Sequence, residues 1–148
     1  MAKDLELAGQ VLDVIPGVMK LLRRELRAAA QSELSIPQHR VLAHLYGGYS
    51  TSAELAELQG VSLPAISKMI DGLARQGFIR RSFKQGNRKQ VFLKLTDKGR
   101  ARYIKSKEMA QARLAVNLAE LSLNDQATLE KGLKVLERLM ENQRTKKA

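Results

Sequence analysis

Residues 51–99 read TSAELAELQGVSLPAISKMIDGLARQGFIRRSFKQGNRKQVFLKLTDKG. Two short helical patterns in this segment are separated by a turn at residues 59–62, and a basic hairpin pattern follows them. A short helix, a tight turn, a second helix and a basic wing are the components of a winged helix-turn-helix. The segment therefore predicts that fold.

The ends of both helices have recognisable start and stop residues. Thr51 and Glu54 form a capping box, in which the hydroxyl accepts from a free amide and the carboxylate reaches back to the cap. Gly60 can end the first helix in a left-handed conformation. Ser62 caps the second helix, and Pro64 lies in its first turn, where a missing amide hydrogen costs little.

The second helix is amphipathic in the way that a helix in a DNA groove requires. At about 100° per residue, Ile66, Ile70 and Leu73 share one face. The opposite face and its flanks carry small, polar or charged residues: Pro64, Ala65, Ser67, Lys68, Asp71 and Arg75. Asp71 would be an unusual acid on a phosphate-facing surface, and its spacing predicts an i,i+4 pair with Arg75.

A basic hairpin is predicted after this helix. Gly77 ends the helix, residues 78–83 read as a strand, and residues 84–89 form a glycine-containing turn before a returning strand with apolar residues at alternate positions. Arginine at the tip of such a hairpin can enter the narrow minor groove. The alternative is a hairpin whose charges are simply solvated.

Several short motifs in this order resemble the MarR family of bacterial transcription regulators. They are Ser35-x-Pro-Gln-His-Arg-Val-Leu, Thr51-x-x-Glu-Leu-Ala, Val61-Ser, Leu73-x-x-x-Gly-Phe-Ile and Leu95-Thr-x-x-Gly. The resemblance covers nearly the whole chain. One departure is in the wing, where the family usually has Asp-x-Arg and this chain has Asn87-Arg88-Lys89, so that Arg88 takes the minor-groove role or the wing binds more weakly.

The resemblance implies a mainly α fold with a β-hairpin wing, in a single domain of residues 1–148. Residues 1–33 and 101–148 would form dimerisation helices around a DNA-binding lobe at residues 34–100. It also implies repression by occupying a promoter, relieved when a small molecule changes the spacing of the two lobes. By position, the effector site would involve Arg23, His39 and Tyr103, which could suit a small aromatic or anionic molecule. The alternative is that Arg23 is solvated and Tyr103 only packs at the dimer interface.

The distribution of charge agrees with a polyanionic partner. The chain has a net charge of +11, from 26 basic and 15 acidic residues. Residues 62–100 alone contain ten basic and two acidic residues. The excess is thus concentrated on the segment predicted to contact DNA.

Composition argues against several other classes. The chain has no cysteine, no tryptophan and few aromatic residues, which excludes thiol chemistry and disfavours single-stranded nucleic acid as the partner. His39 and His44 are about 140° apart around a helix, so they predict no metal site. No acid–base pair or phosphate loop predicts an enzyme or a cofactor. A charged N-terminus and the lack of a long apolar run predict a cytoplasmic protein.

The flanking segments read as helices. One runs from Leu5 to about residue 31, with a kink or break expected near Val14–Ile15 because Pro16 and Gly17 follow; another spans residues 35–46. A long helix starts after Thr96, with Ala101, Ile104, Ala112 and Val116 as its predicted inner face. The last helix carries an apolar stripe of Leu129, Leu133, Leu136 and Met140 at nearly coiled-coil spacing.

We expect a homodimer whose two recognition helices enter successive major grooves of a pseudo-palindromic duplex. Predicted base contacts come from Pro64, Ala65, Ser67 and Lys68. Predicted phosphate contacts come from Thr51, Ser52, Arg75, Arg81, Lys84 and Lys94. Ser62 joins this set at the helix start, and Arg88 or Lys89 would enter the minor groove. The alternative function is an architectural DNA binder, or a winged domain used for protein contacts, that needs no ligand.

Overall fold

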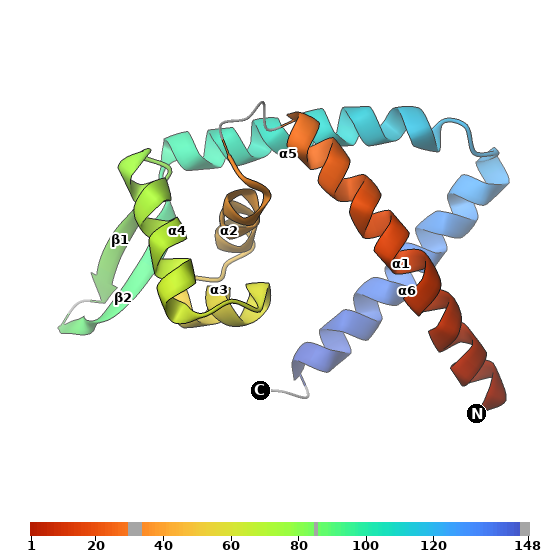
Figure 1. Cartoon of the computed structure of the whole chain (residues 1–148), viewed down its shortest axis with the longest axis horizontal. Coiled ribbons are helices and arrows are strands. Elements are labelled where there is room, and N and C mark those ends of the chain that lie inside the picture. The colour runs from red at the N-terminus through yellow and green to blue at the C-terminus, as the bar shows by residue number, and fades with distance from the viewer. Residues whose placement is uncertain (30–33, 85, 146–148) are drawn as a thin grey trace. The chain divides into compact units, whose positions relative to one another are not determined.

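The computed structural model describes residues 1–29, 34–84 and 86–145, and only the backbone of residues 84, 87–90, 144 and 145. Six helices and a two-stranded sheet follow one another along these residues (Figure 1): α1 (Ala2–Ala29), α2 (Ile36–Tyr46), α3 (Ser52–Gln59), α4 (Leu63–Arg75), β1 (Ile79–Lys84), β2 (Asn87–Leu95), α5 (Asp97–Leu118) and α6 (Leu123–Thr145). The predicted fold class, mainly helical with a hairpin wing, is confirmed. The chain divides into two compact units, Met1–Gln111 and Ala112–Ala148.

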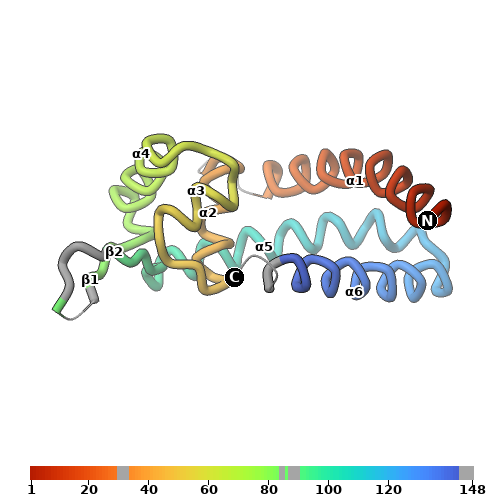
Figure 2. The backbone as a smooth tube through the Cα atoms, turned by 90° about the horizontal axis from the view of Figure 1, so that it is seen from below, coloured from red at the N-terminus to blue at the C-terminus, as the bar shows by residue number. Residues whose placement is uncertain are grey.

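The first unit has its core where α2, α3 and α4 pack together (Figure 2). The fully buried side chains are Val41, Leu42, Leu55, Ile66, Ile70 and Leu73. Each such side chain contributes about 1.5–3 kcal/mol by leaving water, so this cluster is the main source of stability for the lobe. The core fixes which face of α4 remains outside.

The predicted capping box at the start of α2 is present. The Ser35 hydroxyl accepts from the amide of Gln38 at 3.3 Å, and the Gln38 side chain accepts from the amide of Ser35 at 2.9 Å. These bonds satisfy amides that have no partner within the helix. They start α2 at the predicted residue.

Helix α1 differs from the prediction at Pro16. The helix is continuous from Ala2 to Ala29 with Pro16 inside it, so of the predicted kink or break the break is absent, and the kink stays a prediction. Proline deprives the carbonyl four residues earlier, that of Leu12, of its amide partner. Leu12 is 74% exposed and lies outside the core of the first unit, so the helix continues through Pro16 without disturbing that core.

The inner face of α5 agrees with the prediction only at Ile104, which is partly buried and packs against the core of the first unit. Ala101 and Ala112 are exposed, and Val116 is 69% exposed. The buried positions are instead Gly99, Tyr103 and Ser106. The prediction chose the apolar residues of this helix. The face that packs toward the core of the first unit instead contains both apolar and polar residues, Tyr103 among them.

The second unit contains the end of α5 and the whole of α6. Ser122 caps α6, because its hydroxyl accepts from the amide of Asp125 at 3.1 Å. Gln126 donates to the carbonyls of Leu118 and Leu121, each at 3.2 Å, and so satisfies the end of α5. Within the described residues, no helix combines the length and the apolar character that crossing a bilayer requires.

Candidate nucleic-acid interface

Helix α4 begins as the sequence predicted. The Ser62 hydroxyl accepts from the amide of Ala65 at 3.3 Å, and Pro64 is in the first turn. Gly60, with φ of +65°, ends α3 in the left-handed region, where a side chain would be strained. This turn directs the first turn of α4 away from the core.

The buried and exposed faces of α4 are those predicted. Ile66, Ile70 and Leu73 are at most 1% exposed. The outer face is exposed and comprises Pro64, Ala65, Ser67, Lys68, Asp71 and Arg75. An apolar back with a front of short and basic side chains is what a major groove accepts.

One exposed apolar side chain at this helix start was missed from the sequence. Leu63, the first residue of α4, is 55% exposed. This residue has no role predicted from the sequence, because only the tertiary structure shows that the first turn of α4 is exposed. An apolar side chain there suits a thymine methyl group.

Asp71 has a different partner from the one predicted. Its carboxylate is hydrogen-bonded and ion-paired to the guanidinium of Arg81 on β1, not to that of Arg75. In the hairpin Arg81 lies opposite Leu93, which is 2% exposed, so Arg81 is on the face of the hairpin that packs toward the core. The strand register thus carries Arg81 to α4, and its predicted phosphate contact now competes with Asp71.

The other face of the hairpin holds a pair of like charges. Arg80 and Lys94 are directly opposite each other across the antiparallel strands, and both are exposed. Directly opposed like charges destabilise a strand pair, so an anion between them would be favourable. Lys94 was predicted to contact phosphate; Arg80 was missed, because its partner becomes visible only when the register is known.

The tip of the wing is only partly described. The register of the strand pairing shifts between Phe83 and Lys84. The side chains of the predicted contacts Lys84, Arg88 and Lys89 lie outside the described residues. Their roles stay predictions.

The start of α3 contains two further predicted contacts, Thr51 and Ser52. The Thr51 hydroxyl accepts from the amide of Glu54 at 3.2 Å, and the Glu54 carboxylate accepts from the amides of Ser50 and Thr51 at 2.9 and 3.0 Å. These backbone donors, from Ser50 first, hold the pKa of Glu54 below its ordinary value. Both Thr51 and Ser52 are half-buried at the positive end of the helix dipole.

Two of the three predicted effector residues come together. His39 is 6% exposed, and its ring centroid is 5.5 Å from that of Tyr103, which also contacts Tyr46 at 4.8 Å. Burial, and then the nearby positive charge of Arg102, lowers the pKa of His39. His39 is therefore a neutral, buried ring at neutral pH.

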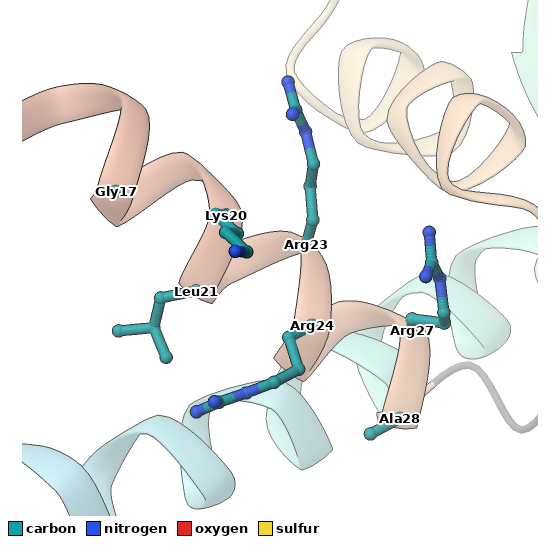
Figure 3. Close-up of a pocket in the computed structure, with 7 residues that line it drawn as sticks. All are labelled: Gly17, Lys20, Leu21, Arg23, Arg24, Arg27 and Ala28. Carbon is teal, nitrogen blue, oxygen red and sulfur yellow. The ribbon is translucent and has the colours of Figure 1, made fainter.

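The third predicted effector residue, Arg23, lies on another surface. It lines an open groove of about 670 Å³ along α1, together with Gly17, Lys20, Leu21, Arg24, Arg27 and Ala28. In Figure 3, Arg23 and Arg27 extend from α1 in one direction and Arg24 in another. The described lining of this groove includes neither His39 nor Tyr103.

Comparison with known proteins agrees with this arrangement. Residues 34–91 match the model of the MarR family. An uncharacterized HTH-type transcriptional regulator, YfiV of Bacillus subtilis (strain 168), is 30% identical over 111 residues, which are 74% of this chain and 69% of YfiV.

Two solved structures share the architecture. Rv1404 from Mycobacterium tuberculosis, at 21% identity, superposes with a TM-score of 0.77 over 95% of each chain. A MarR variant from E. coli, crystallised with operator DNA, is 25% identical with a TM-score of 0.64, over 86% of this chain and 93% of that one. The exposed outer face of α4, the wing beside it and these matches lead to one conclusion: the chain belongs to the MarR family of HTH-type transcriptional regulators.

Proposed function

We propose that two copies of this chain bind a pseudo-palindromic DNA operator and repress transcription until a small molecule releases them. The observation that carries this proposal is the outer face of α4, where exposed short and basic side chains stand on a fully buried apolar back. The similar MarR variant from E. coli was crystallised with operator DNA, which supports duplex DNA as the partner.

Base recognition is assigned to the first two turns of α4. Pro64 and Ala65, together with the exposed Leu63, offer apolar contacts to thymine methyl groups, and Lys68 suits guanine O6 and N7. Ser67 can donate to or accept from a base edge. Ser62, exposed at the start of α4, is assigned a DNA contact beside its role as the cap of that helix.

Phosphate contacts surround this helix. Thr51 and Ser52 lie at the start of α3, and Arg75 lies at the end of α4. Lys94 and Arg80 form the like-charge pair that an anion would relieve. Such contacts position the protein and make binding depend on salt, without reading sequence.

Dimer formation is proposed from apolar surface that each unit leaves uncovered. Leu5 and Leu12 on α1 are 77% and 74% exposed, and Leu133 and Met140 on α6 are 56% and 63% exposed. Burying such surface stabilises by about 25 cal/mol per Å², and a second copy of the chain offers matching stripes. We assign residues 1–33 and 101–148 to this role and residues 34–100 to DNA.

The effector is proposed to be a small aromatic or anionic molecule. Arg23 supplies positive charge for an anion in the groove along α1, and Tyr103 with His39 forms a separate, buried aromatic contact. Release requires that the molecule prefer one spacing of the two DNA-binding lobes, since equal affinity for both spacings shifts nothing.

The test is binding to the DNA that flanks the chain's own gene, compared with a scrambled duplex of the same length. Fluorescence anisotropy at several salt concentrations gives both affinities, and sedimentation gives the oligomeric state. A preference of about a thousandfold or more is expected for a sequence-specific regulator. Equal affinities with the same steep salt slope would instead support an architectural binder that contacts phosphates only.

A matched pair of variants sharpens this test. Lys68→Met removes a charge from the recognition face, and Lys107→Met removes one from an exposed position on α5. If Lys68 reads a base, only Lys68→Met reduces the preference for the operator; equal small losses in both would contradict that role.

A further inference from the structure

Two backbone hydrogen bonds cap the C-terminal end of helix α4. The amide of Phe78 donates to the carbonyl of Leu73 at 2.9 Å, and the amide of Gly77 donates to that of Ala74 at 3.0 Å. Gly77 has φ of +78°, in the left-handed region. Together these features form a Schellman motif, which gives the recognition helix one defined exit into β1.

Thr96 connects this exit to the start of α5. Its hydroxyl donates to the carbonyl of Gly77 at 2.5 Å and accepts from the amide of Gly99 at 3.0 Å. Its own amide donates to the carbonyl of Phe78 at 3.1 Å. One side chain thus caps α5 and binds the turn that ends α4.

Lys98 adds a second connection across the same junction. Its ammonium group donates to the carbonyl of Gln76 at 2.7 Å, at the negative end of the α4 dipole. The same group lies 5.0 Å from the centre of the Phe78 ring. The first turn of α5 therefore contacts the carbonyl of Gln76, the residue that caps α4, and the ring of Phe78, the residue before β1.

Gly99 allows the two backbones to touch. A Cβ atom at this position would overlap the carbonyl oxygen of Phe78 and lie 2.8 Å from its carbonyl carbon. Both atoms belong to the main chain, so they could give way only if the junction itself moved. Figure 1 shows the end of α4, the start of β1 and the first turn of α5 meeting at this point.

We propose that Thr96, Lys98 and Gly99 form a junction clamp that sets the orientation of α4 and the wing from α5. They are positioning residues for DNA binding: none needs to touch DNA, yet each holds the recognition helix relative to α5. A rotation of the start of α5 moves α4 and β1 with it, because the hydrogen bonds leave the junction a single arrangement. This inference rests on the proposed DNA-binding function.

The test uses the full chain with Thr96→Val, which keeps the shape of the side chain but removes the hydroxyl, and Thr96→Ser, which restores it. Thr96→Val loses both part-buried hydrogen bonds of the hydroxyl, the one to Gly77 and the one from Gly99. We expect it to bind the operator about tenfold more weakly, while affinity for the scrambled duplex stays within about twofold. Thr96→Ser should recover the operator affinity. Circular dichroism verifies that each variant is folded at the assay temperature.

Amide hydrogen exchange tests the clamp without DNA. In the wild-type protein the amides of Thr96, Gly99 and Phe78 should exchange slowly and at similar rates. Thr96→Val should accelerate all three by about tenfold, while the amides of Val41 and Leu42 in the core keep their rates.

Three outcomes would overturn the clamp. They are fast exchange of these amides in the wild-type protein, unchanged operator binding by folded Thr96→Val, and equal losses on both duplexes. If the wild-type chain prefers no duplex while the exchange pattern is as expected, the DNA-binding proposal fails and the clamp stands.

Discussion

The guanidinium of Arg81, on the first wing strand, is ion-paired with the carboxylate of Asp71 on the exposed face of α4. Both side chains are largely accessible, at 43% and 57% of their surface. A pair this exposed contributes little to stability, about 0–1 kcal/mol. The pair matters for DNA binding through its charge. It neutralises the acid on the outer face of α4, and it keeps Arg81 from phosphates.

Asp71→Asn should increase affinity for any DNA, because it removes a negative charge and frees Arg81 for phosphate. We expect binding to a scrambled duplex to tighten by about threefold to tenfold and the salt slope to steepen by about one. Anisotropy titrations at several salt concentrations measure both. Glu108→Gln, the same change at an exposed site on α5, is the control; weaker binding by Asp71→Asn would show that the pair itself is needed on DNA.

Lys68 and Lys94 should differ in what their loss does to binding. Lys68→Ala, on α4, should cost about 1–3 kcal/mol on the operator and relax preference at one base pair. Lys94→Ala, on β2, should weaken binding to all duplexes alike and lower the salt slope by about one. Competition with operator duplexes that each carry one changed base pair distinguishes the two variants. If Lys68→Ala and Lys94→Ala lose affinity equally across these duplexes, Lys68 does not read a base.

His39 should make stability depend on pH. Its pKa in the unfolded chain is near the ordinary value of 6.5, and burial and Arg102 lower it in the folded protein. Between the two values the unfolded state binds more protons, so the free energy of unfolding rises with pH there. The contribution is complete above pH 6.5 and is lost as the pH falls from 6.5 toward the folded pKa.

His39→Phe keeps a ring beside Tyr103 and removes this titration. Urea midpoints at about pH 7.5 and about pH 5.5 should differ less in the variant than in the wild-type protein. His44→Gln provides the comparison for the other histidine. If the urea midpoint of His39→Phe falls between these two pH values by as much as that of the wild-type protein, the pH dependence belongs to other groups.

Gly60 and Gly132 should respond oppositely to alanine. Gly60 has φ of +65° at the α3–α4 turn, so Gly60→Ala should destabilise by about 1–2 kcal/mol. Gly132 lies inside α6 with nothing within 4 Å of an added Cβ, so Gly132→Ala should stabilise by about 0.5–1 kcal/mol. Urea unfolding at one protein concentration measures both. Gly60→Asn should be milder than Gly60→Ala, since asparagine tolerates this conformation; the reverse order would place the strain elsewhere.

Local sequence determines the elements and the faces of this lobe. The caps at Ser35, Thr51 and Ser62 and the stop at Gly60 form where the sequence predicts them, because each hydrogen bond spans only three or four residues. The helical period alone separates the buried face of α4 from its exposed face. The continuity of α1 through Pro16 escaped such rules, since a proline can either break a helix or lie within it.

Partners distant in sequence are decided by the tertiary structure. The register of the hairpin, which no local pattern specifies, brings Arg81 to Asp71 and sets Arg80 opposite Lys94. The close approach of α5 to Phe78 explains why a glycine is required at Gly99. A helix period or a cap acts within one turn of the chain, whereas these contacts exist only after the core of α2, α3 and α4 has formed and placed the strands and α5 against it.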